Sequence, residues 1–441
     1  MRVIAVAKEF RARQLVPMTE IAAVQVIAPE TERSTVKRLM VFFAAVYLAE
    51  GICQSDGLIS QPLNFYLKQV HGWTAVQVTA FLTVFNLPWF FKPFYGIVSD
   101  FVPLFGYRRK SWMLAANGAA AAGYVAVMTT GAPDMILVLL LIAVYGMAIV
   151  STLSGAILVE AGQKLQASSR FVNQQWLWFN VAAIATSLLG GVLVQWFTPI
   201  NALHAAALMA GISPLAAIVC TLTLIEEDKS AISLAGMKAS LGSLSMALKT
   251  RQLWVIGGFL FFFYFSPGLD TPLYFFMTDR LKFSQAYIGV LNSINAVGGI
   301  AAALVYASYL RNVSTRNMLH LAIFAGVVST LGFALMRDPV TAALAQFFYG
   351  AASMWTLVAS LGLAADYCPR RAEAFGFAAM VAVTNLSGAV ADNVGSWFYE
   401  HLFGGEIAPL VVVAAAFTAL NFALVPLLNL RGGIARPVWM A

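Results

Sequence analysis

Glu50, Asp56 and Asp270 are carboxyl groups that lie inside long apolar stretches of the sequence. A buried carboxyl group favours its neutral form, so it can take up and release a proton near neutral pH. This chemistry could couple the protein to a proton gradient. Glu50 and Asp56 are six residues apart, which would place them about 120° apart on one continuous helix and in different surroundings. A solvated position near a helix end is the alternative for Asp56 and Asp270, whereas Glu50 is too deep for it.

A second group of side chains could bind a flat, anionic small molecule. The ammonium group of Lys92 could attract a carboxylate, or it could extend to the nearby membrane surface. Asp392 is not expected to pair with Lys92, because the two should lie near opposite membrane surfaces. Asparagines can bond a heterocycle or a neighbouring helix, and aromatic rings can stack on a ligand or pack in the core. The candidate binding residues are Asn86, Trp89, Lys92, Tyr264, Asp270, Asn292 and Asn385.

The third group follows the pattern Gly96-x-x-x-Asp100-x5-Gly106-x-Arg108-Arg109. Gly96 would permit a close helix approach, and Asp100 could pair with an arginine or a facing helix N-terminus. We expect such a pair to form when this face of the protein closes and to break when it opens. Glu160, at the end of a later apolar run, could join this gate or could simply be solvated. A solvated basic loop would explain the arginines, but not the spacing of Gly96 and Asp100.

The composition is that of a membrane protein with several spans. Of the 441 residues, 60% are hydrophobic and only 11% are charged, too few to cover a soluble protein of this size. The three cysteines are scattered and predict neither a disulfide framework nor a metal site. Motifs for metal-dependent hydrolysis, a nucleophile elbow or ATP binding do not occur. We therefore expect no enzyme activity, cofactor or metal, and we attribute the net charge of +7 to membrane topology rather than to nucleic-acid binding.

Twelve apolar runs are each long enough to span a bilayer. The first, seventh and eleventh contain many polar residues, as helices that line a wet cavity would. The runs cover approximately residues 39–65, 76–99, 111–130, 134–160, 171–197, 201–225, 252–278, 285–310, 317–336, 339–365, 373–402 and 407–429.

The basic residues predict the orientation of these runs. With the N-terminus inside, 22 of the 27 lysines and arginines lie on the cytoplasmic side and four lie outside, with Lys92 in the membrane. Both termini are therefore expected in the cytoplasm. The expected parts are a tail (1–38), a six-helix bundle (39–226), a polar cytoplasmic linker (227–251), a second six-helix bundle (252–430) and a C-terminal tail (431–441).

The two expected bundles resemble each other in sequence. "QPLNFYLKQVHGWTAVQV" matches "TPLYFFMTDRLKFSQAYI" at an offset of 210 residues, with Pro62 aligned to Pro272 and Thr74 to Ser284. Related halves joined by a cytoplasmic linker are typical of transporters that work by alternating access. Chance similarity between apolar segments is the alternative for any single match.

Several blocks resemble the folate–biopterin transporter family of the major facilitator superfamily. They include "PLNFYLKQVHGW", "LPWFFKPFYGIVSDFVPLFGYRR", "LVEAG", "SPGLDTPLYFFMTDRLKFS" and "EAFGFAAMVAVTNLSGAVADNVGSW". The resemblance implies an all-α membrane protein with twelve transmembrane helices in two pseudo-symmetric halves. It also implies a proton-driven carrier of pterins or folates. The fourth run departs from the family, because "STLSGAILVE" keeps only Glu160 of the acids that are typical there. The cargo could therefore be another planar anion.

Two other functions stay open at this point. The chain could be a transporter-like protein that no longer transports and serves as a membrane assembly factor or sensor. It could also carry a different cargo, such as a peptide-linked sugar or a siderophore. We expect a monomer in the plasma membrane with H⁺ as the coupling ion; Na⁺, and either direction of transport, are compatible with the sequence.

Overall fold

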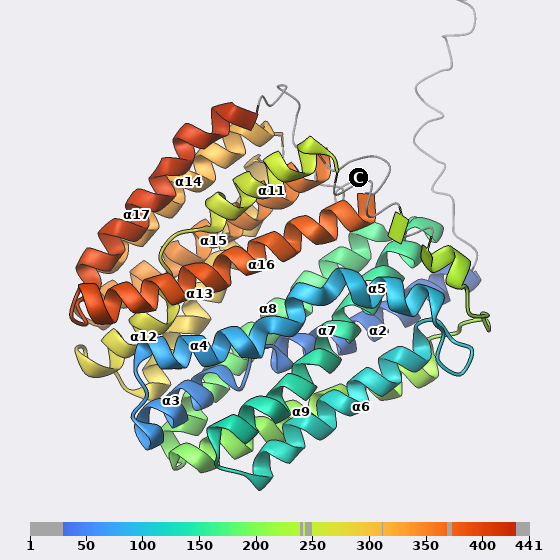
Figure 1. The fold of residues 1–441 in the computed structure, drawn as a ribbon, viewed down its shortest axis with the longest axis horizontal. Coiled ribbons are helices and arrows are strands. Elements are labelled where there is room, and N and C mark those ends of the chain that lie inside the picture. Colours follow the sequence, from blue (N-terminus) through green and yellow to red (C-terminus); the bar gives the residue numbers. More distant parts are fainter. Residues whose placement is uncertain (1–29, 239–240, 243–248, 311, 368–372, 429–441) are drawn as a thin grey trace, which may run out of the picture. The chain divides into compact units, whose positions relative to one another are not determined.

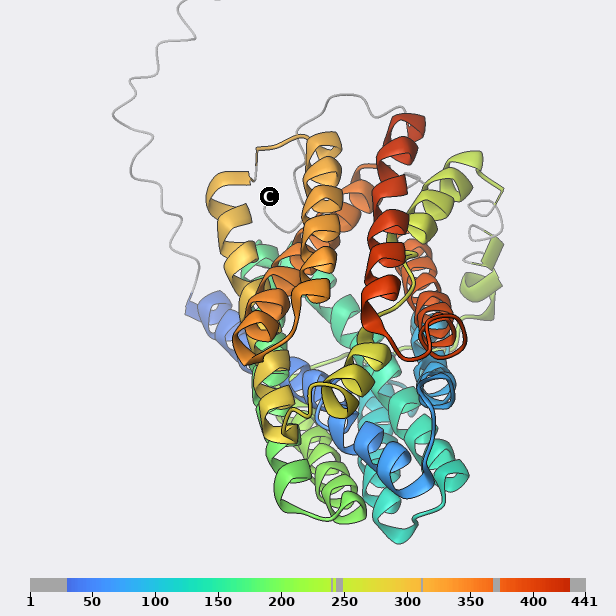
Figure 2. The same ribbon diagram turned by 90° about the vertical axis from the view of Figure 1, so that its left-hand side faces the viewer.

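The computed structural model describes residues 30–238, 241–242, 249–310, 312–367 and 373–428. The chain divides into two compact units, Met1–Arg38 and Leu39–Ala441, and the following description concerns the second unit. Most of the expected N-terminal tail and the whole C-terminal tail (431–441) lie outside the described residues. The described part is all-helical, and its one β-type contact is an isolated bridge in the loop before α6 (Figures 1 and 2).

We call residues 39–224 the first half and residues 251–428 the second half. The first half contains α2 (Glu30–Cys53), α3 (Ser60–His71), α4 (Ala75–Asn86), η1 (Leu87–Phe91), α5 (Lys92–Phe101), α6 (Lys110–Ala126), η2 (Val127–Thr129), α7 (Pro133–Lys164), α8 (Ser168–Trp196) and α9 (Pro199–Leu224). The second half contains α11 (Arg251–Tyr264), α12 (Asp270–Asp279), α13 (Gln285–Val305), η3 (Tyr306–Leu310), α14 (Thr315–Gly332), η4 (Phe333–Leu335), α15 (Pro339–Tyr367), α16 (Glu373–Trp397), η5 (Phe398–Leu402), α17 (Ile407–Leu424) and η6 (Val425–Leu428).

Seven helices in the described residues are long and apolar enough to cross a membrane, and several expected spans are broken into shorter pieces. The first expected span breaks between α2 and α3, where an added Cβ at Gly57 would lie 2.5 Å from a backbone oxygen of Ile52. The second turns into the 3-10 helix η1 around Pro88, and the seventh breaks at residues 265–269. Proline removes a backbone donor and interrupts a regular helix. The twelve-span arrangement stays a prediction.

Matching backbone events recur 210 residues apart. The helices α3 and α12 resume after their breaks at Ser60 and Asp270. Gly72 and Lys282 both have positive φ, 66° and 54°. The helices α4 and α13 then begin at equivalent positions, and the residue before each, Thr74 or Ser284, accepts a hydrogen bond from a backbone N–H three residues later. The local signals of the aligned segments thus produce the same turn twice.

Close helix contacts join the two halves. α8 packs against α13, and α4 packs against α16. At the first contact an added Cβ on Gly191 would lie 2.8 Å from the backbone oxygen of Gln285. Small residues permit this approach of two backbones. We call the end of the bundle that carries the loop from α5 to α6 the basic end, at the right of Figure 1, and the end that carries Gly72 and Lys282 the opposite end.

Candidate functional site: a buried ion chain, three carboxylates and two polar ends

The buried centre of the first half holds a chain of polar side chains. Lys92 Nζ donates to Ser151 Oγ at 2.9 Å, and that hydroxyl donates to Glu50 Oε1 at 2.6 Å. Glu50 is only 6% exposed, and its second oxygen has no hydrogen-bond partner. The structure therefore brings two sequence candidates, Glu50 and Lys92, together through Ser151, which sequence reasoning missed because serine is common in helices.

Local sequence explains how Lys92 reaches this position. The segment "LPWFFKP" forms the 3-10 helix η1, and α5 begins at Lys92 itself. Trp89 lies on the same turn, and its ring centroid is 4.6 Å from Lys92 Nζ. A cation over an aromatic face is stabilised by the ring quadrupole. Trp89 thus contacts Lys92 directly, and the Lys92 ammonium points towards Ser151 of α7.

The breaks in the first and seventh runs gather three carboxyl groups. Asp56 lies in the irregular segment after α2 and Asp270 begins α12; both side chains are exposed. They interact electrostatically with each other and with the half-buried Asp392 of α16. Asp392 packs on the other break, where an added Cβ at Gly268 would collide with it.

Two sequence interpretations change here. Asp56 is not on a continuous helix with Glu50, because α2 ends at Cys53, so the expected 120° separation was wrong. Asp392 lies with Asp56 and Asp270, a grouping that the sequence did not predict. Its position in a run expected to line a wet cavity was the available signal.

The other candidate binding residues are dispersed. Tyr264 shares a hydrogen bond of 2.8 Å with Ser360, so its hydroxyl is used between helices. Asn86 ends α4 and is half-buried, Asn292 is exposed on α13, and Asn385 is half-buried on α16. These four residues do not share a described contact with the Lys92 chain.

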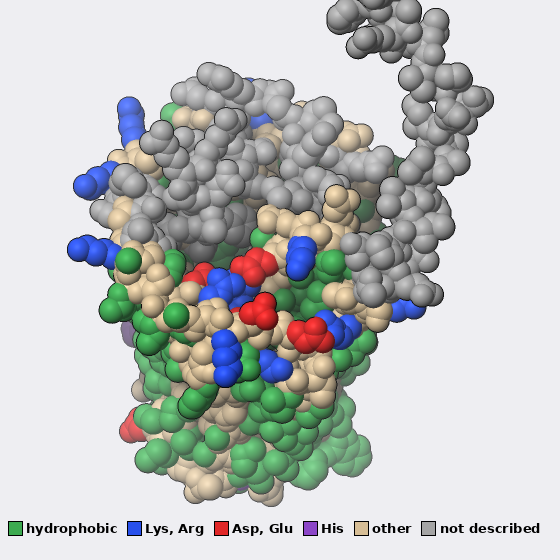
Figure 3. Space-filling view, turned by 90° about the vertical axis from the view of Figure 1, so that its right-hand side faces the viewer, with side chains coloured by type: hydrophobic (Ala, Val, Ile, Leu, Met, Phe, Trp, Pro, Cys, Tyr) green, Lys and Arg blue, Asp and Glu red, His purple; other side chains and the backbone are tan. Residues whose placement is uncertain are grey.

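The sequence candidates for a gate converge at the basic end. Arg109 is 5% exposed, and its guanidinium donates to both oxygens of Glu160 at 2.6 and 2.5 Å and to Asp100 at 3.3 Å. Arg108 lies 3.8 Å from Asp100 and 3.6 Å from Glu160. We call Asp100, Arg108, Arg109 and Glu160 the gate cluster. Acidic and basic side chains gather across this face in Figure 3.

The geometry of the gate cluster differs from the expected latch. All four members belong to the first half, so separating the halves would not break these ion pairs. An added Cβ at Gly96 would meet the Thr152 methyl group at 3.6 Å, an ordinary contact, so this glycine is not needed for a close approach here. Gly106 has φ +85°, a conformation that L side chains rarely adopt, so glycine is required at that turn.

Hydrogen bonds between the halves lie towards the opposite end. Lys68 donates to Thr278 and forms an ion pair of 2.6 Å with Asp279. Its ammonium also lies 4.2 Å from the ring centroid of Phe275. Gln61 Nε2 donates to the backbone oxygen of Gln285 at 2.7 Å. These contacts fasten α3 to α12 and α13.

Two more bonds continue this seam between α4 and α16. Thr79 and Ser396 share a hydrogen bond of 2.7 Å, and Asn393 donates to Thr83 at 2.6 Å. None of these inter-half bonds involves a member of the gate cluster.

This helical arrangement is similar to the folds of solved membrane transporters. The solved nucleoside transporter NupG has a TM-score of 0.66 with this chain at 15% identity, covering 89% of this chain and all of that one. A D-xylose–proton symporter has a TM-score of 0.65 at 12% identity, covering 89% and 97%. At these identities the similarity establishes the fold alone.

Sequence comparison assigns the family. The model of the BT1 family matches residues 51–430, and the chain belongs to this family. It is 24% identical to the folate-biopterin transporter of Synechocystis sp., over 87% of this chain and 80% of the relative. It is 21% identical to folate transporter 2 of Plasmodium falciparum, over 85% and 86%. The expected family resemblance is confirmed, and the protein is a multi-pass membrane protein of a transporter family rather than an enzyme.

Proposed function

We propose that this protein is a proton-coupled secondary transporter that moves a folate- or pterin-like anion, or another organic anion, by alternating access. Relatives named for folate and biopterin transport support the cargo class. The single observation that carries the mechanism is the chain from Lys92 through Ser151 to Glu50. It connects a cation suited to an anionic substrate with a carboxyl group suited to a proton.

The chain suggests how substrate and proton are coupled. While Glu50 is ionised, its negative charge offsets the positive charge of the nearby Lys92, and the Ser151 hydroxyl connects the two side chains. Protonation of Glu50 removes that charge and leaves the ammonium free to attract a substrate carboxylate. Asp56 and Asp270 provide two further carboxyl groups that can bind protons. They lie at the helix breaks, where their exposed side chains are accessible to protons. Asn86, Trp89, Tyr264, Asn292 and Asn385 then belong to the wall that the substrate passes.

The topology belongs to the same proposal. Twelve spans form bundles 39–226 and 252–430, joined by the linker 227–251. The basic end and both termini are cytoplasmic in the plasma membrane, because basic residues are retained inside. The inter-half bonds at the opposite end then close the outer side. The unit of transport is a monomer, and H⁺ is the coupling ion.

The decisive experiment is uptake of labelled folate and pterins into proteoliposomes, with and without an inward proton gradient. We expect gradient-driven uptake by the wild type and its loss in Glu50→Gln, which imitates the protonated state permanently. Asp134→Asn is the matched control, because this exposed acid lies at the far end of α7. Uptake driven equally well by Na⁺ alone would overturn the proton assignment.

Failure of well-folded wild type to bind or move any pterin would overturn the cargo assignment. A screen of other organic anions, including siderophores and peptide-linked sugars, would then separate a different carrier from a protein that has lost transport altogether.

A further inference from the structure

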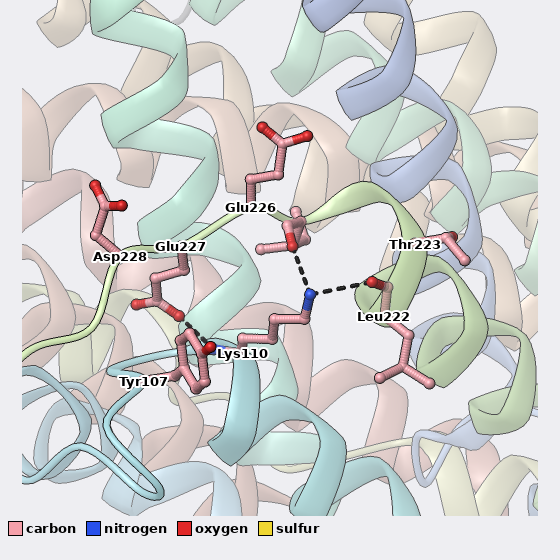
Figure 4. Close-up of a pocket in the computed structure, with 8 residues that line it drawn as sticks. Tyr107, Lys110, Leu222, Thr223, Glu226, Glu227 and Asp228 are labelled. Atoms are coloured by element: carbon pink, nitrogen blue, oxygen red, sulfur yellow. Dashed lines mark hydrogen bonds between the residues drawn. The ribbon is translucent and has the colours of Figure 1, made fainter.

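The segment that follows α9 crosses the loop before α6, beside the gate cluster. We call residues 225–233 the linker strap. A pocket of about 510 Å³ lies between the strap, the end of α9 and the start of α6. Figure 4 shows the Glu227 carboxylate reaching the start of Lys110, whose own side chain extends towards Leu222. The strap belongs to the stretch that connects the two halves of the chain.

Two opposite charges cap two helices across this pocket. The Glu227 carboxylate accepts hydrogen bonds from the backbone N–H groups of Arg109, at 3.1 Å, and Lys110, at 2.8 Å. In return, Lys110 Nζ donates to the backbone oxygens of Leu222 at 3.0 Å and Ile225 at 2.8 Å. An anion at a helix N-terminus and a cation at a helix C-terminus are both favourable, because each satisfies unpaired backbone groups.

Backbone contacts extend the attachment along the loop. The N–H of Ser230 donates to the oxygen of Gly106 at 2.8 Å, and the N–H of Ser233 donates to the oxygen of Phe101 at 3.0 Å. The aliphatic part of Lys229 covers Gly106. The strap therefore holds both ends of the loop that joins α5 to α6.

Arg109 is the point where the strap and the gate cluster meet. Its backbone N–H is held by Glu227, while its side chain donates to Glu160 and Asp100. The guanidinium is almost fully buried, and its Nε has no hydrogen-bond partner. A buried charge that lacks some hydrogen bonds stabilises the protein only when its remaining ion pairs have good geometry. The backbone that carries the Arg109 side chain must therefore be held in place.

We propose that the linker strap positions the gate cluster, with Glu227 as the positioning residue. Glu227 fixes the first turn of α6 and so directs Arg109 at Glu160 and Asp100. Because the gate cluster belongs to the proposed transport machinery, losing this contact is expected to slow transport. The transport consequence rests on the proposed function; the structural consequence does not.

Hydrogen exchange on the full-length protein tests the structural part. The variants are Glu227→Ala, Glu227→Gln, which keeps one acceptor oxygen, and Asp228→Ala as the exposed neighbour control. We expect exchange at the amides of Arg109 and Lys110 to rise about tenfold in Glu227→Ala, the loss expected for hydrogen bonds to a charged group. Glu227→Gln should be intermediate and Asp228→Ala should match the wild type. Wild-type exchange at both amides in Glu227→Ala would overturn the proposal.

Transport kinetics test the second part. Glu227→Ala should lower the maximal uptake rate without changing KM, because Glu227 does not touch the substrate path, and Glu227→Gln should restore part of the rate. A changed KM with an unchanged maximal rate would contradict a positioning role. If the wild type transports nothing, the proposed function fails while the exchange result still decides the role of the strap. If Glu227→Ala does not fold, the test rests on Glu227→Gln. In that case, wild-type amide exchange at Arg109 and Lys110 together with a wild-type maximal uptake rate in Glu227→Gln would overturn the proposal.

Discussion

The ion pairs at the two ends of the bundle differ in what they join. At the basic end, Arg109 binds Glu160 and Asp100 within the first half. At the opposite end, Lys68 binds Asp279 across the two halves. A pair within one rigid half is kept when the halves move, whereas a pair between halves must break. If the halves move as proposed, we expect the gate cluster to brace the first half and the Lys68–Asp279 pair to control the opening of the opposite end.

The position of Lys68 sharpens this difference. Its partner Thr278 is 210 residues further along the chain, the same offset that aligns the two halves in sequence. Equivalent positions of α3 and α12 therefore touch each other. If the two halves are related by a pseudo-two-fold axis, equivalent positions that touch must lie close to that axis.

The largest expected effect comes from reversing the charge at Lys68. Lys68→Glu removes an ion pair in which Lys68 is 10% exposed and Asp279 is 52% exposed, and it places like charges across the halves, so the opposite end should open. A hydrogen bond to a charged group contributes about 1.5–3 kcal/mol, enough to move the population of states about tenfold or more. Distances between spin labels at Gln69 and Lys282 should shift to longer values.

The double variant Lys68→Glu with Asp279→Lys should restore the wild-type distances at the opposite end. A distribution that does not respond to Lys68→Glu, or a double variant that stays open, would remove this pair from the opening step.

The second prediction concerns stability at the basic end. Arg109→Gln should lower the free energy of unfolding by about 2 kcal/mol, less than the 3–5 kcal/mol of a fully buried pair, because Glu160 is 55% exposed. Thermal unfolding measures this loss. Spin-label distances at the opposite end should be unchanged; an opening there comparable to that of Lys68→Glu would show that the two ends do not have separate roles.

The third prediction concerns the centre, between the two ends. Ser151→Ala leaves Glu50 and Lys92 without their shared hydroxyl and should cost about 1–3 kcal/mol of stability. Proton-driven uptake should fall while spin-label distances at both ends remain as in the wild type. Ser154→Ala is the matched control, because Ser154 is also buried on α7 and its hydroxyl donates to the backbone oxygen of Ser151 rather than to Glu50. Equal losses in the two variants would argue against a specific role of Ser151.

The smallest effect is expected at Arg280. Its ion pair with Glu406 is 2.7 Å long, but both side chains are more than half exposed and both lie in the second half. Exposed pairs contribute about 0–1 kcal/mol. Arg280→Ala should therefore leave both the unfolding temperature and the distances at the opposite end nearly unchanged. A marked opening would show that any charge at this end, rather than the inter-half pair, controls it.

Local chemistry explains why parts of the site were predictable. The pattern from Gly96 to Arg109 lies in one short loop, so its members meet wherever that loop folds. Glu160 could be added because its run ends at the same predicted membrane surface. Charge distribution and apolar run length likewise predict an all-helical, multi-pass membrane protein, since the bilayer admits few alternatives.

Other contacts depend on how helices pack. Ser151 is one of several polar residues on α7, and only the placement of α5 and α2 beside it selects it as the connection between Lys92 and Glu50. The same holds for Asp392 and Glu227. Asp392 packs on the helix break at Gly268, and Glu227 binds the N-terminus of α6, and both contacts join distant parts of the chain. The breaks after Cys53 and Tyr264 also decided exposure, because they moved Asp56 and Asp270 off continuous helices.

By itself, the sequence determined the membrane class, the family, the helical runs and the turns repeated 210 residues apart, because these follow from hydrophobicity, motif spacing and backbone preferences acting over a few residues. Only the tertiary structure decided which charges are paired within one half and which across both. Ion pairing depends on distances of a few ångströms between residues tens to hundreds of positions apart, and helix packing alone sets those distances.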